Sequence, residues 1–141
     1  MIVVCGGNQR LYHSLCKTYG KRMIILNHTD QMALYLKACD VFITKPGGLS
    51  STEAAVVGIP MIHLTPIPGC ETKNMRFFSK NGMSIAVSSL KKDLLKALDH
   101  LDDIENCENM KKRQRQVIHA SAACDICDLA EEIVRTQKEM D

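Results

Sequence analysis

The sequence contains no tryptophan, and only three tyrosines and three phenylalanines among its 141 residues. So few aromatic side chains argue against the stacking surfaces on which many proteins hold single-stranded nucleic acid. The formal net charge of +2 is also too small to indicate such a partner. We therefore predict that the chain binds no nucleic acid.

Long apolar runs are also missing from the sequence. The longest ones have the length of a strand, so no membrane span is predicted. The first residues read as a strand rather than a secretory signal. Seven cysteines are an odd number, and they are scattered through the expected strands and helices, which is typical of a reduced protein. We expect a cytoplasmic protein.

Strand and helix patterns alternate along the whole chain. Strands are expected at residues 2–5, 22–26, 41–44, 61–64 and 83–87, with helices between them and three helices after the last strand. This alternation predicts an α/β fold, a three-layer parallel sheet with flanking helices. A length of 141 residues suits one domain over 1–141.

Residues 38–66 hold the stretch that carries chemistry. An apolar run at 41–43 ends in the loop Lys45-Pro46-Gly47-Gly48, and a helix is expected to begin at Ser50. A second apolar run follows at 61–64. This order predicts a strand–loop–helix–strand unit with its loop at the carboxyl edge of the sheet, where ligands bind in open α/β folds.

The loop has the features of a phosphate site. Adjacent glycines remove two side chains and permit dihedral angles closed to other residues. The helix after them presents unpaired N–H groups to an anion, and Lys45 adds a positive charge. Glu53, about one turn into the helix, can accept two hydrogen bonds from a diol such as ribose. Together these features suggest a nucleotide diphosphate.

A purely structural interpretation fits the same residues. Ser50-x-x-Glu53 matches a capping box, and Gly47-Gly48 matches a tight turn. The local pattern alone favours this interpretation, because short motifs have many false positives. Neither a Walker loop nor a Gly-x-Gly-x-x-Gly fingerprint is present.

A longer stretch adds a family resemblance. ITKPGGLSSTEAAVVGIPMI, followed by PIPGCETKNMRFF, resembles the donor-binding half of lipid-acceptor glycosyltransferases of family 28. The likeness runs from Val3 to about Leu101 and is greatest to the branch of processive diacylglycerol glucosyltransferases and monogalactosyldiacylglycerol synthases. It implies the Rossmann-like C-terminal half of a two-domain GT-B fold, lacking the first βα unit. It also implies inverting transfer of glucose or galactose from a UDP-sugar to a lipid such as diacylglycerol.

The resemblance also implies roles for loop residues. Glu53 would hold the ribose hydroxyls, and the backbone at 28–29 would lie against uracil. The two glycines would sit near the pyrophosphate, Glu71 and Asn74 would face the donor sugar, and two lysines would add charge near the phosphates. The implied UDP-sugar site comprises His28, Thr29, Lys45, Pro46, Gly47, Gly48, Ser50, Glu53, Glu71, Lys73 and Asn74.

No metal and no cofactor is expected beside the UDP-sugar donor. A helix end and lysines can stabilise the charge that develops on a UDP leaving group. The Asp-x-Asp motif, which anchors a metal and diphosphate in the other large glycosyltransferase architecture, does not occur. Cys70 stands where the related loop usually has glutamine, so the implied sugar contacts differ there.

The larger departure lies before Ile2. Relatives carry an acceptor domain and a first βα unit there, and these would supply the lipid site and the catalytic base. We therefore expect no catalytic residue in this chain and no transfer by it alone. The lost strand would be central in a 3-2-1-4-5-6 sheet. Strands 2–5 and 41–44 should therefore pair with each other, pair with another chain, or leave edges that invite self-association.

Two other functions are compatible with the sequence. The chain could be a stand-alone donor subunit with a membrane partner, as in the split transferase acting on dolichol-linked sugar, or a non-catalytic nucleotide-binding module. The basic run at 111–115 would suit peripheral contact with anionic lipid, but a solvated helix face is the favoured interpretation. Cys124-x-x-Cys127 falls within a predicted helix, which favours ordinary cysteines over a redox or metal site.

Overall fold

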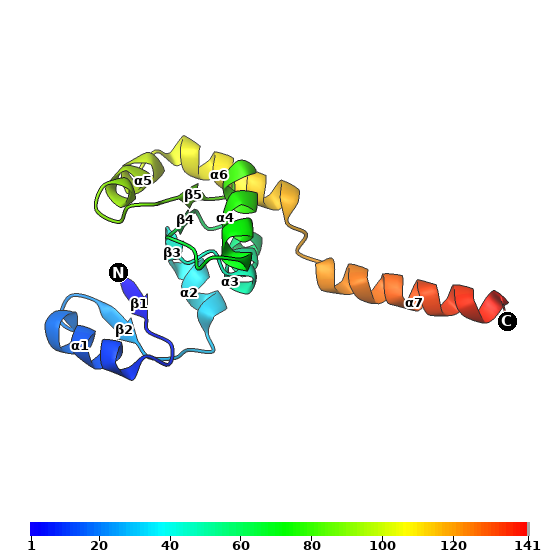
Figure 1. Cartoon of the computed structure of the whole chain (residues 1–141), viewed down its shortest axis with the longest axis horizontal. Helices are drawn as coiled ribbons and strands as arrows, with labels where there is room; N and C mark the ends of the chain where they lie inside the picture. The colour runs from blue at the N-terminus through cyan, green and yellow to red at the C-terminus, as the bar shows by residue number, and fades with distance from the viewer. Residues whose placement is uncertain (141) are drawn as a thin grey trace. The chain divides into compact units, whose positions relative to one another are not determined.

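The computed structural model describes residues 1–140 of the chain (Figure 1). Contacts between residues divide it into two compact units, Met1–Tyr35 and Leu36–Asp141. Strands and helices alternate in the predicted order. They are β1 (Ile2–Val4), α1 (Gln9–Tyr19), β2 (Ile24–Leu26), α2 (Met32–Ala38), β3 (Phe42–Thr44), α3 (Gly48–Val57), β4 (Met61–His63), α4 (Cys70–Lys80), β5 (Ile85–Ala86), α5 (Asp93–Leu101), α6 (Ile104–Val117) and α7 (Ala122–Met140).

The first unit is a small parallel βαβ arrangement. β1 pairs with β2 in parallel, with Ile2 opposite Ile24. The Asn8 side chain accepts a hydrogen bond from the Leu11 N–H at 3.0 Å and so caps α1. No residue of α1 is buried, and Leu11 and Tyr19 are 43% and 41% exposed.

The second unit contains a three-stranded parallel sheet in the order β3-β4-β5. The central strand β4 is buried at all three of its positions. This arrangement confirms the predicted α/β fold with a parallel sheet and flanking helices. The strands are shorter than predicted at most of their ends.

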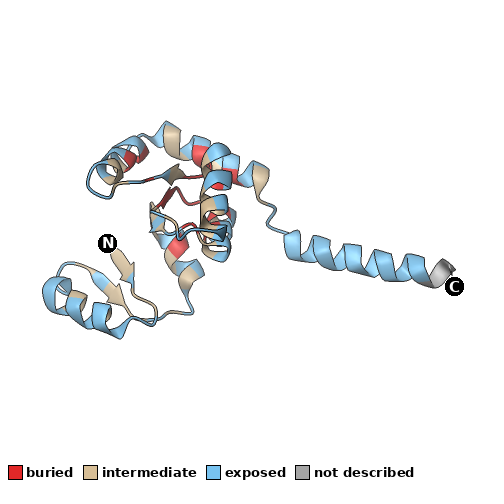
Figure 2. Cartoon of the chain, viewed as in Figure 1, coloured by how far each residue is buried: buried red, intermediate tan, exposed pale blue. Residues whose placement is uncertain are grey.

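Side chains of β4 pack against helices on both faces of the sheet, because successive residues of a strand point to opposite faces. Ile62 joins a core with residues of α5 and α6, among them Leu101 and Met110. His63 contacts Ser51 of α3 and the ring of Phe78 in α4 on the other face. Figure 2 shows the buried residues gathered in this unit, along β4 and the helices around it.

The basic run at 111–115 is only partly a solvated face. Lys112 and Arg113 are exposed as predicted, but Gln114 is fully buried. Its Nε2 donates hydrogen bonds to the carbonyl oxygens of Ile59, at 2.9 Å, and Met83, at 3.1 Å. Gln114 therefore fastens α6 to the segments that lead into β4 and β5.

Among residues 1–140, each sheet is formed within one of the two units: β1-β2 in the first and β3-β4-β5 in the second. Within its own sheet, β1 and β3 are each the outermost strand. The three alternatives for these strands, direct pairing, pairing with another chain and open edges, stay predictions.

Helix α7 confirms the last predicted helix, and its described side chains, from Ala122 to Gln137, are all exposed. Both cysteines of the Cys124-x-x-Cys127 pair are among them. Among the described residues, none of the helices has the length and apolar character needed to cross a membrane.

Candidate functional site

Two loops of the second unit meet at one edge of the sheet. One follows β3 and the other follows β4, and these neighbouring strands are parallel, so both loops leave at the carboxyl edge. The Lys45 Nζ lies 3.1 Å from Glu71 Oε1, and the Asn74 Nδ2 donates to the Pro46 carbonyl oxygen at 3.0 Å. The structure therefore brings four of the predicted site residues together.

Glu71 closes the second loop as well as pairing with the first. Its Oε2 accepts a hydrogen bond from the Ile67 N–H at 2.7 Å. That N–H, and after it the Lys45 ammonium, holds the pKa of the Glu71 carboxyl below its ordinary value. The ionised Glu71 carboxylate therefore connects the two loops. A sugar hydroxyl that donates to it would compete with the Ile67 N–H and the Lys45 ammonium.

Helix α3 begins at Gly48, two residues before the predicted start at Ser50. Gly47 is its N-cap, and the Ser51 N–H donates to the Gly47 carbonyl oxygen at 3.1 Å. Ser50 is consequently the third residue of the helix, so the capping-box alternative is wrong. The first N–H groups of the helix have no acceptor within it and face the loop.

Gly47 and Gly48 do not adopt the dihedral angles, closed to other residues, that the sequence predicts for a glycine pair. Positive φ angles occur at four other glycines, including Gly58 and Gly69, but not at Gly47 or Gly48. A Cβ on Gly47 would come within 3.1 Å of Ser50 Oγ, which is tight. A Cβ on Gly48 would meet nothing closer than Asn74 Nδ2 at 3.7 Å, an ordinary contact. Neither dihedral angle nor space within the chain requires glycine at position 48.

Glu53 lies on α3 one turn after the residues that open the helix. It follows Leu49 by four positions and Ser50 by three, so the three share a helix face. Glu53 is exposed, and Leu49 is 83% exposed. Lys73, on α4, is exposed as well. This face of α3 therefore carries an accessible carboxylate, that of Glu53, beside the N-terminal end of the helix.

His28 and Thr29 belong to the first unit, so they are described apart from the others. His28 is exposed. The Thr29 hydroxyl oxygen accepts a hydrogen bond from the Gln31 N–H at 3.1 Å, just before α2 begins.

A buried polar cluster behind the site was missed. The His63 Nε2 lies 3.0 Å from Ser51 Oγ, and its Nδ1 lies 3.0 Å from Ser84 Oγ. Burial lowers the pKa of His63 to about 4. His63 therefore stays neutral at pH 7 and links the first turns of α3 to the segment before β5.

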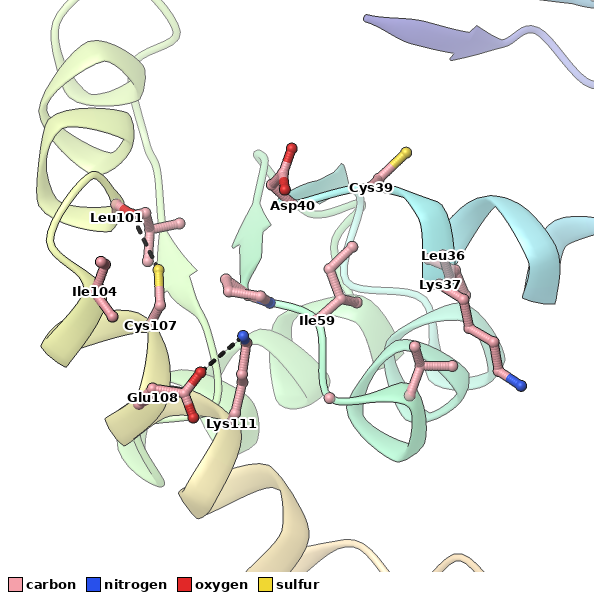
Figure 3. Close-up of a pocket in the computed structure, with 13 residues that line it drawn as sticks. Leu36, Lys37, Cys39, Asp40, Ile59, Leu101, Ile104, Cys107, Glu108 and Lys111 are labelled. Atoms are coloured by element: carbon pink, nitrogen blue, oxygen red, sulfur yellow. Dashed lines mark hydrogen bonds and ion pairs between the residues drawn. The ribbon is translucent and has the colours of Figure 1, made fainter.

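A cavity of about 400 Å³ lies elsewhere in the second unit (Figure 3). Asp40 and Pro60, which precede β3 and β4, line it, so it opens at the edge of the sheet opposite to the two loops. On the wall formed by α6, Lys111 Nζ pairs with Glu108 Oε1 at 2.9 Å. No predicted site residue is among the residues that line it.

Comparisons with known proteins match this chain over most of its length. The family model described as "Glycosyltransferase family 28 C-terminal domain" matches residues 1–130. Processive diacylglycerol beta-glucosyltransferases from Bacillus subtilis and Bacillus licheniformis are 30% and 32% identical over 99% of this chain, which spans 37% and 38% of their lengths. The crystal structure of Acinetobacter baumannii MurG superposes on 93% of the chain with a TM-score of 0.76 at 21% identity, and the chain spans 40% of it.

Proposed function

Because the chain belongs to the family of glycosyltransferase family 28 C-terminal domains, we propose that it binds the UDP-sugar donor of a lipid glycosyltransferase. The reaction proposed for the whole enzyme is inverting, metal-independent transfer of glucose or galactose to an acceptor such as diacylglycerol. The relatives' name, processive diacylglycerol beta-glucosyltransferase, supports glucose as the transferred sugar and diacylglycerol as the acceptor. The chain spans under two fifths of these relatives, so the acceptor site and the catalytic base are assigned to a part outside it.

The geometry at the carboxyl edge supports binding of a diphosphate. The free N–H groups at the start of α3, with the positive end of its dipole, would accept phosphate oxygens. Lys45, whose side chain is 58% exposed, would add charge from the rim, although its pairing with Glu71 offsets part of that charge. Glu53 would accept hydrogen bonds from the ribose hydroxyls. In the reaction, the same N–H groups would stabilise the charge of departing UDP.

Gly48 is the observation that carries the proposal. A glycine in the middle of a helix costs roughly 0.5–1 kcal/mol of stability relative to alanine, and this is the upper bound for Gly48, the first residue of α3. At position 48 neither a positive φ nor a crowded neighbour compensates for that cost. The remaining reason for glycine is the close approach of something outside the chain to the helix start. A pyrophosphate there would occupy the space of the absent Cβ.

Gly48→Ala is therefore expected to separate stability from binding. The variant should be as stable as the wild type, or more stable by up to about 1 kcal/mol, in urea unfolding. Calorimetric titration of UDP should show at least a roughly tenfold loss of affinity, equivalent to about 1.4 kcal/mol, because the added methyl group displaces the phosphate.

Gly58→Ala provides the matched control. Gly58 has a φ of +78° at the end of α3, where an L-residue is strained, so this variant should lose roughly 1–2 kcal/mol of stability. It should keep the UDP affinity of the wild type. Unchanged UDP binding by Gly48→Ala, or no binding by the folded wild type, would count against the proposed function.

A further inference from the structure

We propose that His63 is a positioning residue for nucleotide binding, because it fixes the start of α3, where the diphosphate would bind. The ligand rests on the proposed function, whereas the evidence for the positioning comes from buried contacts within the second unit. His63 is completely buried, so it would not touch the nucleotide itself. It would act through Ser51 of α3 and through Phe78 of α4.

The first turn of α3 contains both the free N–H groups and the residue that His63 holds. The Ser51 N–H donates to the Gly47 carbonyl oxygen at 3.1 Å, so the N–H groups at residues 48–50 are those without an acceptor in the helix. Ser51 follows these residues directly, and its side chain is completely buried. Movement of Ser51 would therefore move the N–H groups that are proposed to meet the phosphates.

His63 holds Ser51 through a buried hydrogen bond. The Ser51 Oγ lies 3.0 Å from the His63 Nε2, and the other ring nitrogen, Nδ1, lies 3.0 Å from the Ser84 Oγ. Because both nitrogens are paired, turning the ring would leave a buried polar atom without a partner, which is costly. Ser51 is therefore bonded to a ring of fixed orientation on β4.

His63 also supports the second helix that frames the loop. Its ring meets the Phe78 ring edge to face, with the ring centroids 5.5 Å apart. Phe78 follows Asn74 by four positions on α4, so the two side chains share a helix face. Asn74 donates to the Pro46 carbonyl oxygen at 3.0 Å, in the loop that leads into α3. His63 thus contacts both helices that hold the loop 45–48.

Packing alone does not require a histidine in β4. The strand is buried at all three positions, and the other two residues, Met61 and Ile62, are apolar. A buried imidazole needs hydrogen bonds to offset the loss of water, and it obtains them from Ser51 and Ser84. Buried polar networks specify one arrangement of the elements that they connect. Here that arrangement is the seating of the α3 start on β4.

Gln114 provides a comparison within the same unit. It is also completely buried and also makes two hydrogen bonds, to the carbonyl oxygens of Ile59 and Met83. These carbonyl groups precede β4 and β5, at the edge of the sheet opposite to the two loops. Loss of the Gln114 side chain should therefore reduce stability without disturbing the start of α3.

His63→Leu and Gln114→Met in the full chain test the proposal as a matched pair. Each replaces a buried polar side chain by an apolar one of similar size, so both should lower the midpoint of urea unfolding. In calorimetric titration, His63→Leu should bind UDP at least roughly fivefold more weakly than the wild type, because the start of α3 is no longer fixed. Gln114→Met should stay within about twofold of the wild-type affinity.

Two further variants separate the hydrogen bond from the packing of the ring. Ser51→Ala removes the bond to His63 and keeps the imidazole, so it should lose UDP affinity as His63→Leu does. His63→Gln can still bond to both serines and should bind UDP more tightly than His63→Leu. If His63→Leu does not fold, Ser51→Ala decides.

Hydrogen exchange in the chain without nucleotide tests the same hydrogen bond directly. In Ser51→Ala, the protection of the residue 51 amide, which is bonded to the Gly47 carbonyl oxygen, should fall at least roughly tenfold relative to that of the Gly58 amide. The Gly58 amide donates to Ala54 at the other end of α3 and serves as the internal reference. In Gln114→Met, the ratio of the two protections should equal that of the wild type.

Two results would overturn the proposal: an equal loss of UDP affinity in Ser51→Ala and Gln114→Met, or wild-type affinity and exchange in Ser51→Ala. A folded wild type that does not bind UDP would instead contradict the proposed function. The exchange comparison would then still decide whether His63 fixes the start of α3, so the two failures are distinguishable.

Discussion

Replacing Glu53 by alanine is expected to weaken UDP binding by roughly 10- to 100-fold. A hydrogen bond to a charged group contributes about 1.5–3 kcal/mol, and the Glu53 carboxylate is accessible on the face of α3 beside the phosphate site. Because Glu53 is exposed, its removal should change the free energy of unfolding by no more than about 0.5 kcal/mol. Calorimetric titration measures the affinity, and urea unfolding measures the stability.

A modified ligand makes the test specific for the ribose. 2′-Deoxy-UDP lacks one hydroxyl group, so the wild type should bind it more weakly than UDP, whereas Glu53→Ala should bind both alike. Thr52→Ala, at the adjacent exposed position, serves as the control and should bind UDP like the wild type. If Glu53→Ala still prefers UDP over its deoxy analogue to the same degree, Glu53 does not contact the ribose.

Acid is expected to destabilise the second unit through His63. Its pKa falls from 6.5 to about 4 on burial, so between these pH values the unfolded chain binds a proton that the folded chain does not. Stability from this group is complete above pH 6.5 and is lost as the pH falls to about 4. A shift of that size corresponds to about 3 kcal/mol. Urea unfolding at several pH values measures the slope.

Two variants assign that slope to His63. His63→Gln removes the titrating group but can still form hydrogen bonds with Ser51 and Ser84, so its stability should vary less between pH 6.5 and 4 even if it is lower throughout. His13→Gln, at an exposed position, should keep the wild-type slope. An unchanged slope in His63→Gln would mean that other groups cause the acid sensitivity.

Much of the fold could be predicted because the local signals are strong. Short β-branched runs between amphipathic segments predicted the strands and helices in their correct order, with errors confined to element ends. The start of α3 was placed two residues late, because Ser50 imitates a cap while the true N-cap, Gly47, has no side chain to reveal it. Two adjacent glycines predict unusual dihedral angles, but neither Gly47 nor Gly48 adopts a positive φ.

The supporting contacts could not be predicted, because they join residues far apart in the sequence. His63 meets Ser51 and Ser84 across 12 and 21 positions, and Gln114 reaches Ile59 across 55. Nothing in a run of lysine and arginine indicates that its one glutamine is turned inward. The pairing of Lys45 with Glu71 also depends on two loops that meet only when β3 and β4 pair.

The most direct test of the central claim is a UDP titration followed by amide NMR of the isotope-labelled chain. We predict saturable shifts that are largest at Gly48, Leu49 and Ser50, whose N–H groups would meet the phosphates. Shifts confined to residues around the opposite cavity, such as Asp40 and Cys107, or no shifts from a folded chain, would contradict the proposed site.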